Sequence, residues 1–455
     1  MDLAITSWGR RISSFKSEAL WVFLGQTGNA LGVLLGMKVL TQVLDPFEFG
    51  RLSIGNTVVL LISNSLFGPL GHGFMRFWSI SHDRDQVEEF VFTANRYGGW
   101  LLFFVLAGSF VFFVFSSATG WFDSQDLIAV ALIVGALVGY FGLRLAVLLG
   151  ARKRKIVALI NVGAAIFKPL GATFLVIVFV SNADCAMWGY LITTLGILLI
   201  VEHYYKNVIK EDLKSSSNNH GNGVKAGEMG KEILAFSWPF CAWGIFVWIH
   251  QSCDRWSLLA FHGADVVGAF SVVALLAAYP LMFSSGFLLN LFMPVAYERA
   301  GSLSSYSALK SAYKFILVMV AVYTLGAVAL IGFFVFFHEA IVLLMSNAEY
   351  VKFSYLLPVL TLSWAFFYLG EALAAFGLIA KKPETYVLPK IISAMIAAVG
   401  TFFLSSEIGA QGVVWALGIS GLFYAAWCAI IAFRFFNRMS SLTAKPSEME
   451  TIEKV

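Results

Sequence analysis

Charged residues are scarce in this sequence. Only 13% of its 455 residues are Asp, Glu, Lys or Arg, whereas 59% are hydrophobic. A soluble domain carries about 25% charged residues, so this composition excludes a soluble globular protein. Hydrophobic runs of around 20 residues recur along nearly the whole chain, and a helix of about that length crosses a bilayer. The sequence therefore predicts an all-α polytopic membrane protein.

Cysteine is also rare. The four cysteines lie in or beside apolar segments, and none has the CxxC or Cys/His spacing of a metal site. We therefore expect no disulfide framework, no bound metal and no cofactor. The sequence also contains nothing that resembles a nucleophile–base set, a P-loop or a basic stripe for nucleic acid. The sequence thus indicates neither an enzyme nor a nucleic-acid-binding protein.

The hydrophobic runs predict twelve transmembrane helices in two six-helix lobes around a central cavity. Their approximate ranges are 20–44, 52–75, 97–118, 127–149, 156–180, 186–205, 233–261, 267–293, 313–337, 353–380, 386–404 and 411–433. The longest polar stretch, 206–232, is rich in Ser, Asn and Gly, which is typical of a flexible linker. We expect it to separate an N-terminal lobe, 1–205, from a C-terminal lobe, 233–435, with a cytoplasmic tail at 436–455.

The distribution of basic residues predicts the orientation. With the N-terminus inside, 25 of the 31 Lys and Arg fall on the cytoplasmic side, and only Arg51 and Lys352 fall outside. The loops are short, which is the case in which the positive-inside rule applies. We therefore expect both termini in the cytoplasm.

The two halves begin alike. An outer turn and a Gly-x-x-Ser sequence follow the first helix of each half, as Gly50 and Ser53 in one and Gly268 and Ser271 in the other. A constant offset of 218 residues relates these pairs. This pattern favours a parallel repeat, and a transporter built from two such repeats binds its substrate between them.

The stretch 249–275, IHQSCDRWSLLAFHGADVVGAFSVVAL, places two charges inside a predicted membrane helix. His250 and Asp254 are four residues apart and share a helix face, and Gln251 and Arg255 share the adjacent face. Charges inside a membrane cost roughly 2.5–3.5 kcal/mol each on insertion scales, so they face a polar cavity or each other. Two interpretations stay open: a cavity-lining arc, or an Asp254–Arg255 pair that neutralises itself and orients the helix.

Three further residues are candidates for the cavity in the first lobe. Lys168 is in the middle of its predicted helix, where a lysine reaches the surface least easily, so we favour a cavity role. Lys38 near the outer end of the first helix either faces the cavity or extends to the outer surface. Asn29 in the same helix is a further candidate for the cavity lining.

Three more charged residues complete the candidates. Glu371 in the tenth predicted helix either pairs with a base or binds a coupling proton, and Asp254 shares these two roles. Arg76 and Arg144 near inner helix ends are candidates for the inner mouth of the cavity, although extension to the cytoplasmic surface is the default for both. The charges predicted within the helices sum to +2, which favours an anionic substrate.

Two segments resemble a known family. VLTQVLDPFEFGRLSIGNTVV and SCDRWSLLAFHGADVVGAFSVV resemble the opening and seventh-helix motifs of the polysaccharide-transport branch of the multidrug/oligosaccharidyl-lipid/polysaccharide (MOP) exporters. NAEYVKFSYLLPVL resembles the start of that family's tenth helix. The resemblance covers about 20–435. The residues of this sequence that match the family's motif positions, and to which we carry over its motif, are Asp254, Arg255 and Gly268. Phe270 stands where the family often has Tyr.

The resemblance implies a Wzx-like flippase of the bacterial inner membrane. Such a protein moves polyprenyl-diphosphate-linked oligosaccharide units from the cytoplasmic to the periplasmic leaflet by alternating access, for O-antigen (lipopolysaccharide) or other surface polysaccharide. Its expected partners are that substrate and membrane lipids, and also a polysaccharide polymerase and a chain-length regulator. The alternative is a MATE-type multidrug or cation antiporter, which shares the architecture but would be expected to carry acids in the first lobe.

Overall fold

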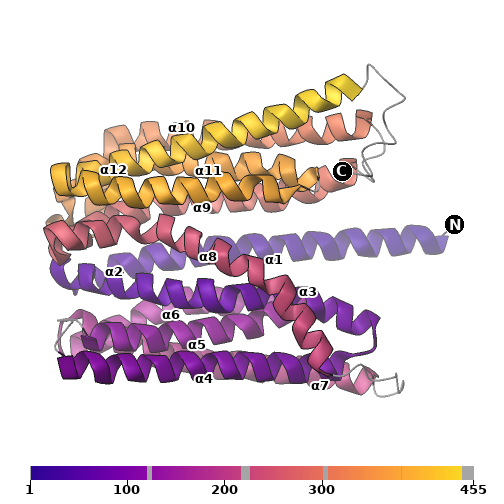
Figure 1. Cartoon of the computed structure of the whole chain (residues 1–455), viewed down its shortest axis with the longest axis horizontal. Helices are drawn as coiled ribbons and strands as arrows, with labels where there is room; N and C mark the ends of the chain where they lie inside the picture. The colour runs from indigo at the N-terminus through magenta and orange to yellow at the C-terminus, as the bar shows by residue number, and fades with distance from the viewer. Residues whose placement is uncertain (1, 120–124, 217–225, 301–305, 381, 443–455) are drawn as a thin grey trace. The chain divides into compact units, whose positions relative to one another are not determined.

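The computed structural model describes residues 2–119, 125–216, 226–300, 306–380 and 382–442 (Figure 1). The regular elements of these ranges are all helical, and eleven stretches among them are long and apolar enough to cross a membrane. The predicted fold class is confirmed in this respect. The chain divides into two compact units: unit 1 is Met1–Ser271 with Met345–Glu349, and unit 2 is Val272–Leu344 with Tyr350–Val455.

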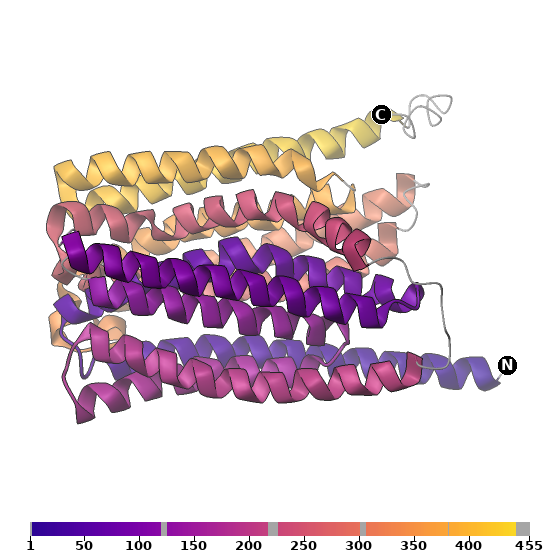
Figure 2. The ribbon, with the colours of Figure 1, turned by 60° about the horizontal axis from the view of Figure 1, so that its bottom comes forward.

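Unit 1 is a bundle of long helices. Its elements are α1 (Asp2–Leu40), α2 (Pro46–Leu60), the π-helix η1 (Leu61–Phe67), α3 (Gly68–Asp83), α4 (Val87–Thr119), α5 (Gln125–Gly150), α6 (Arg154–Val178), α7 (Ala183–Ser216), α8 (Ala226–His262) and the start of α9 (Ala264–Ala300). The N-terminal part of α1 extends past the ends of its neighbours in this unit (Figure 2). The second predicted span is one continuous run of α2, η1 and α3.

Helix also occupies both ends of the stretch expected to be a linker. α7 continues to Ser216 and α8 begins at Ala226, while residues 217–225 lie outside the described ranges, as does most of the expected tail, 443–455. α8 packs against α3, η1, α2 and α4 of unit 1. The division into lobes at 206–232 stays a prediction.

A glycine stripe joins α1 to α6. Methyl groups built on Gly28, Gly32 and Gly36 would touch Val162, Ala165 and Pro169 respectively. Because the contact positions rise together along both helices, α1 and α6 run parallel. The four-residue glycine spacing is therefore a packing surface, which lets two membrane helices approach closely.

Unit 2 contains the rest of α9, then α10 (Tyr306–Met345, of which the last residue belongs to unit 1), η2 (Ala348–Leu356, of which the first two residues belong to unit 1), α11 (Leu357–Ile379), the short helix η3 (Pro383–Tyr386) and α12 (Val387–Leu442). The last helix is 56 residues long, but Ile408 and Gly409 within it are not helical, and Gly409 has φ +64°. Glycine adopts that backbone conformation without the steric cost of a Cβ.

α12 doubles back on itself at this turn (Figure 1). The hydroxyls of Ser393 and Ser420 are hydrogen-bonded at 2.9 Å although they are 27 residues apart, and a straight helix would separate them by about 40 Å. The eleven apolar stretches therefore contain the twelve predicted spans, with 386–404 and 411–433 as the two limbs of α12.

Candidate functional site

The acid–base pair on α8 is formed and almost completely buried. The Asp254 side chain is 2% exposed and the Arg255 side chain 14% exposed. Arg255 Nη1 lies 3.2 Å from Asp254 Oδ1, and the backbone N–H of Arg255 donates to the same oxygen at 2.8 Å. The two charges therefore neutralise each other within the helix, as one of the two sequence interpretations expects.

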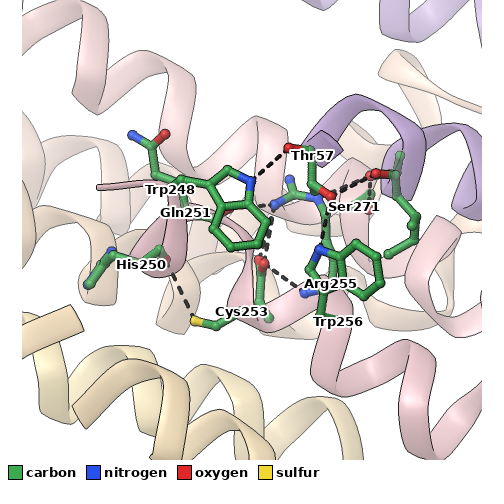
Figure 3. A network of polar contacts seen from close by, with 11 residues as sticks. Thr57, Trp248, His250, Gln251, Cys253, Arg255, Trp256 and Ser271 are labelled. Atoms are coloured by element: carbon green, nitrogen blue, oxygen red, sulfur yellow. Dashed lines mark hydrogen bonds and ion pairs between the residues drawn. The ribbon is translucent and has the colours of Figure 1, made fainter. Parts of the chain in front are cut away.

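The rest of the Arg255 guanidinium ties α8 to α2 (Figure 3). Its Nη1 donates to the backbone oxygen of Gln251 at 3.0 Å, one turn back on α8. Its Nε donates to the Ser53 hydroxyl of α2 at 3.1 Å. Ser53 in turn is hydrogen-bonded to Ser271 of α9 at 2.8 Å. Arg255 is thus a positioning residue for three helix segments of unit 1.

Two tryptophans reinforce the same junction. Trp248 Nε1 donates to the backbone oxygen of Thr57 at 2.7 Å, and Trp256 Nε1 donates to its hydroxyl at 3.0 Å (Figure 3). The Thr57 hydroxyl donates back to the oxygen of Ile54. Thr57 could not be singled out from its sequence position, because a threonine inside a membrane helix usually bonds only its own backbone.

The two repeat glycines meet face to face in unit 1. A methyl group on Gly50 would overlap the backbone oxygen of Ala264, and one on Gly268 would overlap the backbone oxygen of Pro46. Each pair of equivalent positions differs by 218, which is also the separation of the bonded Ser53 and Ser271. The contact is therefore reciprocal, as it would be around a local two-fold axis.

His250 and Gln251 lie on the same helix as the pair. His250 is 3% exposed, and its backbone oxygen accepts a hydrogen bond from Cys253 Sγ at 3.8 Å (Figure 3). Gln251 is half-buried, and its backbone rather than its side chain holds Arg255. His250, Gln251, Asp254 and Arg255 thus form one polar segment of α8.

Two lysines of unit 1 have no acidic partner among the described residues. Lys168 on α6 is half-buried, and its Nζ lies 5.3 Å from the centre of the Phe141 ring on α5. Lys38 on α1 is also half-buried. It lies in the last turn of α1, which ends at Leu40 rather than at residue 44 as predicted, so it is closer to the end of the helix than expected.

Asn29 is half-buried on α1. Helical periodicity places it and Lys38 on different sides of α1, since Gly28 and Gly36 mark the side that faces α6. The structure thus gives two separate polar positions on this helix rather than one polar face.

Arg144 does not extend to the surface. Its side chain is 7% exposed, and its Nε donates to Glu202 of α7 at 2.6 Å. Nη1 donates to Asn95 of α4 at 2.6 Å, and Nη2 donates to the Tyr140 hydroxyl. The default expected for this residue is therefore wrong, because an acid and two neutral acceptors inside unit 1 hold the charge. Arg76, by contrast, is exposed on α3.

Glu371 has the base that the sequence left unidentified. Lys390 on α12 donates to its carboxylate, and the Tyr424 hydroxyl donates to the same oxygen at 3.0 Å. The Lys390 side chain is 8% exposed and the Glu371 side chain 26% exposed. Lys390, which lies within the predicted span 386–404, is thus a buried cation inside unit 2.

No protein-family model and no curated protein matches this chain. Solved structures do. A multidrug resistance MATE family transporter of the MOP superfamily, in its inward-facing conformation, is 13% identical with a TM-score of 0.61, over 93% of this chain and 95% of that one. The lipid II flippase MurJ, in an inward closed conformation, is 14% identical with a TM-score of 0.65, over 93% and 89%.

A third similar structure is a MOP superfamily transporter from Pyrococcus furiosus, described by the reverse polarity of its binding pocket. It is 13% identical with a TM-score of 0.60, over 92% of this chain and 95% of that one. Identities this low show the fold alone. The chain has the fold of MOP superfamily transporters, and these neighbours are transporters and flippases rather than enzymes.

Proposed function

We propose that this protein is a flippase for a polyprenyl-diphosphate-linked oligosaccharide, which it moves from the cytoplasmic to the periplasmic leaflet by alternating access. One observation carries the proposal. Lys38 and Lys168 are the half-buried basic residues that the sequence singled out and that have no acidic partner among the described residues.

The charge balance of the buried groups supports an anionic substrate. Asp254 is paired with Arg255 and Glu371 with Lys390, so neither acid is available to attract a cation. Since pairing removes these charges, the remaining positive charge comes from Lys38 and Lys168. A diphosphate carries the complementary charge, and an ammonium binds phosphate well as a point charge.

The alternative, a MATE-type multidrug or cation antiporter, keeps one supporting observation. Glu371, Lys390 and Tyr424 form a connected polar cluster in unit 2, and a carboxylate in such a cluster is a candidate for proton coupling. Cationic drugs would however meet no unpaired acid among the candidate residues. We therefore favour the flippase.

The remaining expectations are part of this proposal. They place the protein in the bacterial inner membrane with both termini in the cytoplasm, in two lobes, 1–205 and 233–435, around a central cavity. The product would serve O-antigen or another surface polysaccharide, made with a polymerase and a chain-length regulator. The charge distribution and the resemblance of the seventh-helix motif support these points.

A gene deletion tests the proposal. In a deletion strain, lipid-diphosphate-linked oligosaccharide should accumulate on the inner leaflet, and re-expression should reverse this. Inverted vesicles and a lectin specific for the sugar report the sidedness. Normal sidedness in the deletion strain, together with lost efflux of cationic drugs, would replace the flippase with the antiporter.

A further inference from the structure

A cavity lies wholly inside unit 1, between α4, α5 and α7. α5 contacts both α4 and α7, and α4 and α7 also contact each other (Figure 1). The cavity has a volume of about 570 Å³, which is within the range of small-molecule sites. Its lining is Val91, Asn95, Arg144, Glu202, Tyr205, Lys206, Ile209, Lys210 and Leu213.

Arg144 is the buried cation that lines this cavity. Its guanidinium stacks on the Tyr205 ring at 4.1 Å and bonds Glu202, Asn95 and Tyr140. An arginine side chain has five N–H groups. Three are used in these bonds, so two have no acceptor among the described residues, on a side chain that lines the cavity.

Two lysines of α7 stand at the rim. Lys206 and Lys210 are four residues apart and share a helix face, and neither has an ion-pair partner among the described residues. The acid of the cavity, Glu202, is already neutralised by Arg144. The lining therefore carries an uncompensated charge of +2, which favours an anion.

Nearby acids do not cancel this charge. Glu211 is paired with Lys153 at 3.6 Å, and Asp212 lies 3.8 Å from His82, both around a different depression next to the α5–α6 turn. Glu88 and Glu89 lie up to one turn before Val91 on α4, and neither is part of the lining. The positive rim is thus local to the cavity.

The other walls are apolar. Val91, Ile209 and Leu213 line the cavity, and large apolar side chains such as Phe92 and Ile200 are exposed on the same two helices, α4 and α7. Trp100 and Tyr204 are also exposed on these helices, and such aromatic residues are enriched at membrane–water interfaces. A ligand that fits this site has a phosphate at one end and a hydrocarbon chain at the other.

We infer that this cavity binds the phosphate headgroup of an anionic membrane phospholipid, with its acyl chain along the apolar wall. Basic pockets between membrane helices at the cytoplasmic end bind acidic headgroups. The same end of unit 1 carries the basic turn 152–155, which the sequence predicts to be cytoplasmic. The site goes beyond the proposed transport function and does not depend on it.

Photo-crosslinking on the full-length protein locates the lipid. A photoreactive residue in place of Val91 should label phosphatidylglycerol in preference to phosphatidylcholine with the same acyl chains. The matched control replaces Leu199, which is 74% exposed on α7 and not part of the lining, and should label both lipids equally. Soluble glycerophosphoglycerol and inorganic phosphate serve as headgroup probes without a chain, and neither should compete.

Charge removal supplies the second measurement. Native mass spectrometry of Lys206→Gln/Lys210→Gln should show about 25-fold weaker retention of phosphatidylglycerol, at about fivefold for each lysine near an anionic headgroup. The control Lys155→Gln/Lys231→Gln removes the same charge elsewhere in unit 1 and should leave retention unchanged. Both variants keep Arg144 and its bonds, so a folding defect is not expected.

Three outcomes would overturn the inference. One is equal labelling of the two lipids from position 91, which would indicate ordinary surrounding lipid. Another is competition by inorganic phosphate at the concentration of the lipid, which would indicate a soluble-anion site. The third is equal loss of retention in the two double variants, which would make the effect one of total charge rather than of this cavity.

Discussion

The contact between Gly50 and Gly268 gives the most quantitative prediction. Alanine at either position would place a methyl group on a backbone oxygen of the facing segment, Ala264 or Pro46. Backbone atoms cannot rotate away, so the two segments must separate. Overpacking a close contact costs about 1–3 kcal/mol, and we expect the upper end here.

Glycines in open positions are the matched controls. Gly99, Gly142 and Gly196 lie in α4, α5 and α7 with no atom within 4 Å of an added methyl group. Alanine there should stabilise the protein by up to about 1 kcal/mol through helix propensity. The two classes of variant should therefore differ by about 2–4 kcal/mol in the free energy of unfolding.

The assay is unfolding of the purified protein in mixed micelles, followed by tryptophan fluorescence. The double variant Gly50→Ala/Gly268→Ala should cost less than the sum of the single variants, because the first methyl already separates the segments that the second would clash with. Wild-type stability of Gly268→Ala, or strictly additive effects of the two, would refute the reciprocal contact.

Two other predictions concern buried polar contacts. Glu371→Leu removes the carboxylate that accepts from the Lys390 ammonium and should destabilise the protein by about 3 kcal/mol, whereas adding Lys390→Met should recover most of that loss in the same unfolding assay; no recovery would argue against the pair. Trp256→Phe removes one hydrogen bond and should cost about 1 kcal/mol, whereas Thr57→Val also removes the bond to Ile54 and should cost about 2 kcal/mol. Their double variant should cost little more than Thr57→Val alone, and full additivity would contradict the bond between Trp256 and Thr57.

Much of this architecture could be predicted from the sequence because membrane helices are long and apolar. The twelve runs correspond to the observed helices, and the turn that separates the last two spans contains Gly409, where φ is positive. The offset of 218 residues between the two halves also corresponds to a contact, since Ser53 and Ser271, which are 218 residues apart, are hydrogen-bonded to each other. A repeat places equivalent residues near a shared axis, where they meet each other.

The pairing of charges could not be predicted in the same way. Lys390 is four residues inside a predicted span, but that position does not identify its partner. Its partner Glu371 is 19 residues away on another helix. Helical spacing relates only residues of one helix, so it cannot identify this partner. Arg144 and Glu202 are 58 residues apart and meet only through packing of α5 on α7.

The polar segment on α8 shows the same limit. The Asp254–Arg255 pair was one of two interpretations that the sequence left open, and the sequence could not show that Ser53 of α2 accepts a bond from the guanidinium. That bond depends on the close approach of α2 and α9 at Gly50 and Gly268. A sequence pattern identifies the polar residues of a helix, whereas packing decides which partner each of them receives.

Transport by purified protein in liposomes tests the central claim most directly. A fluorescent polyprenyl-diphosphate disaccharide on one leaflet, quenched from outside, reports translocation. Wild-type protein and Lys168→Arg should move it, whereas Lys168→Gln should slow translocation roughly 10- to 100-fold through loss of one charge-assisted contact. The control Lys352→Gln, which lies outside the candidate site, should transport normally. Wild-type rates for both Lys168→Gln and Lys38→Gln, or no translocation by the wild-type protein, would contradict the account.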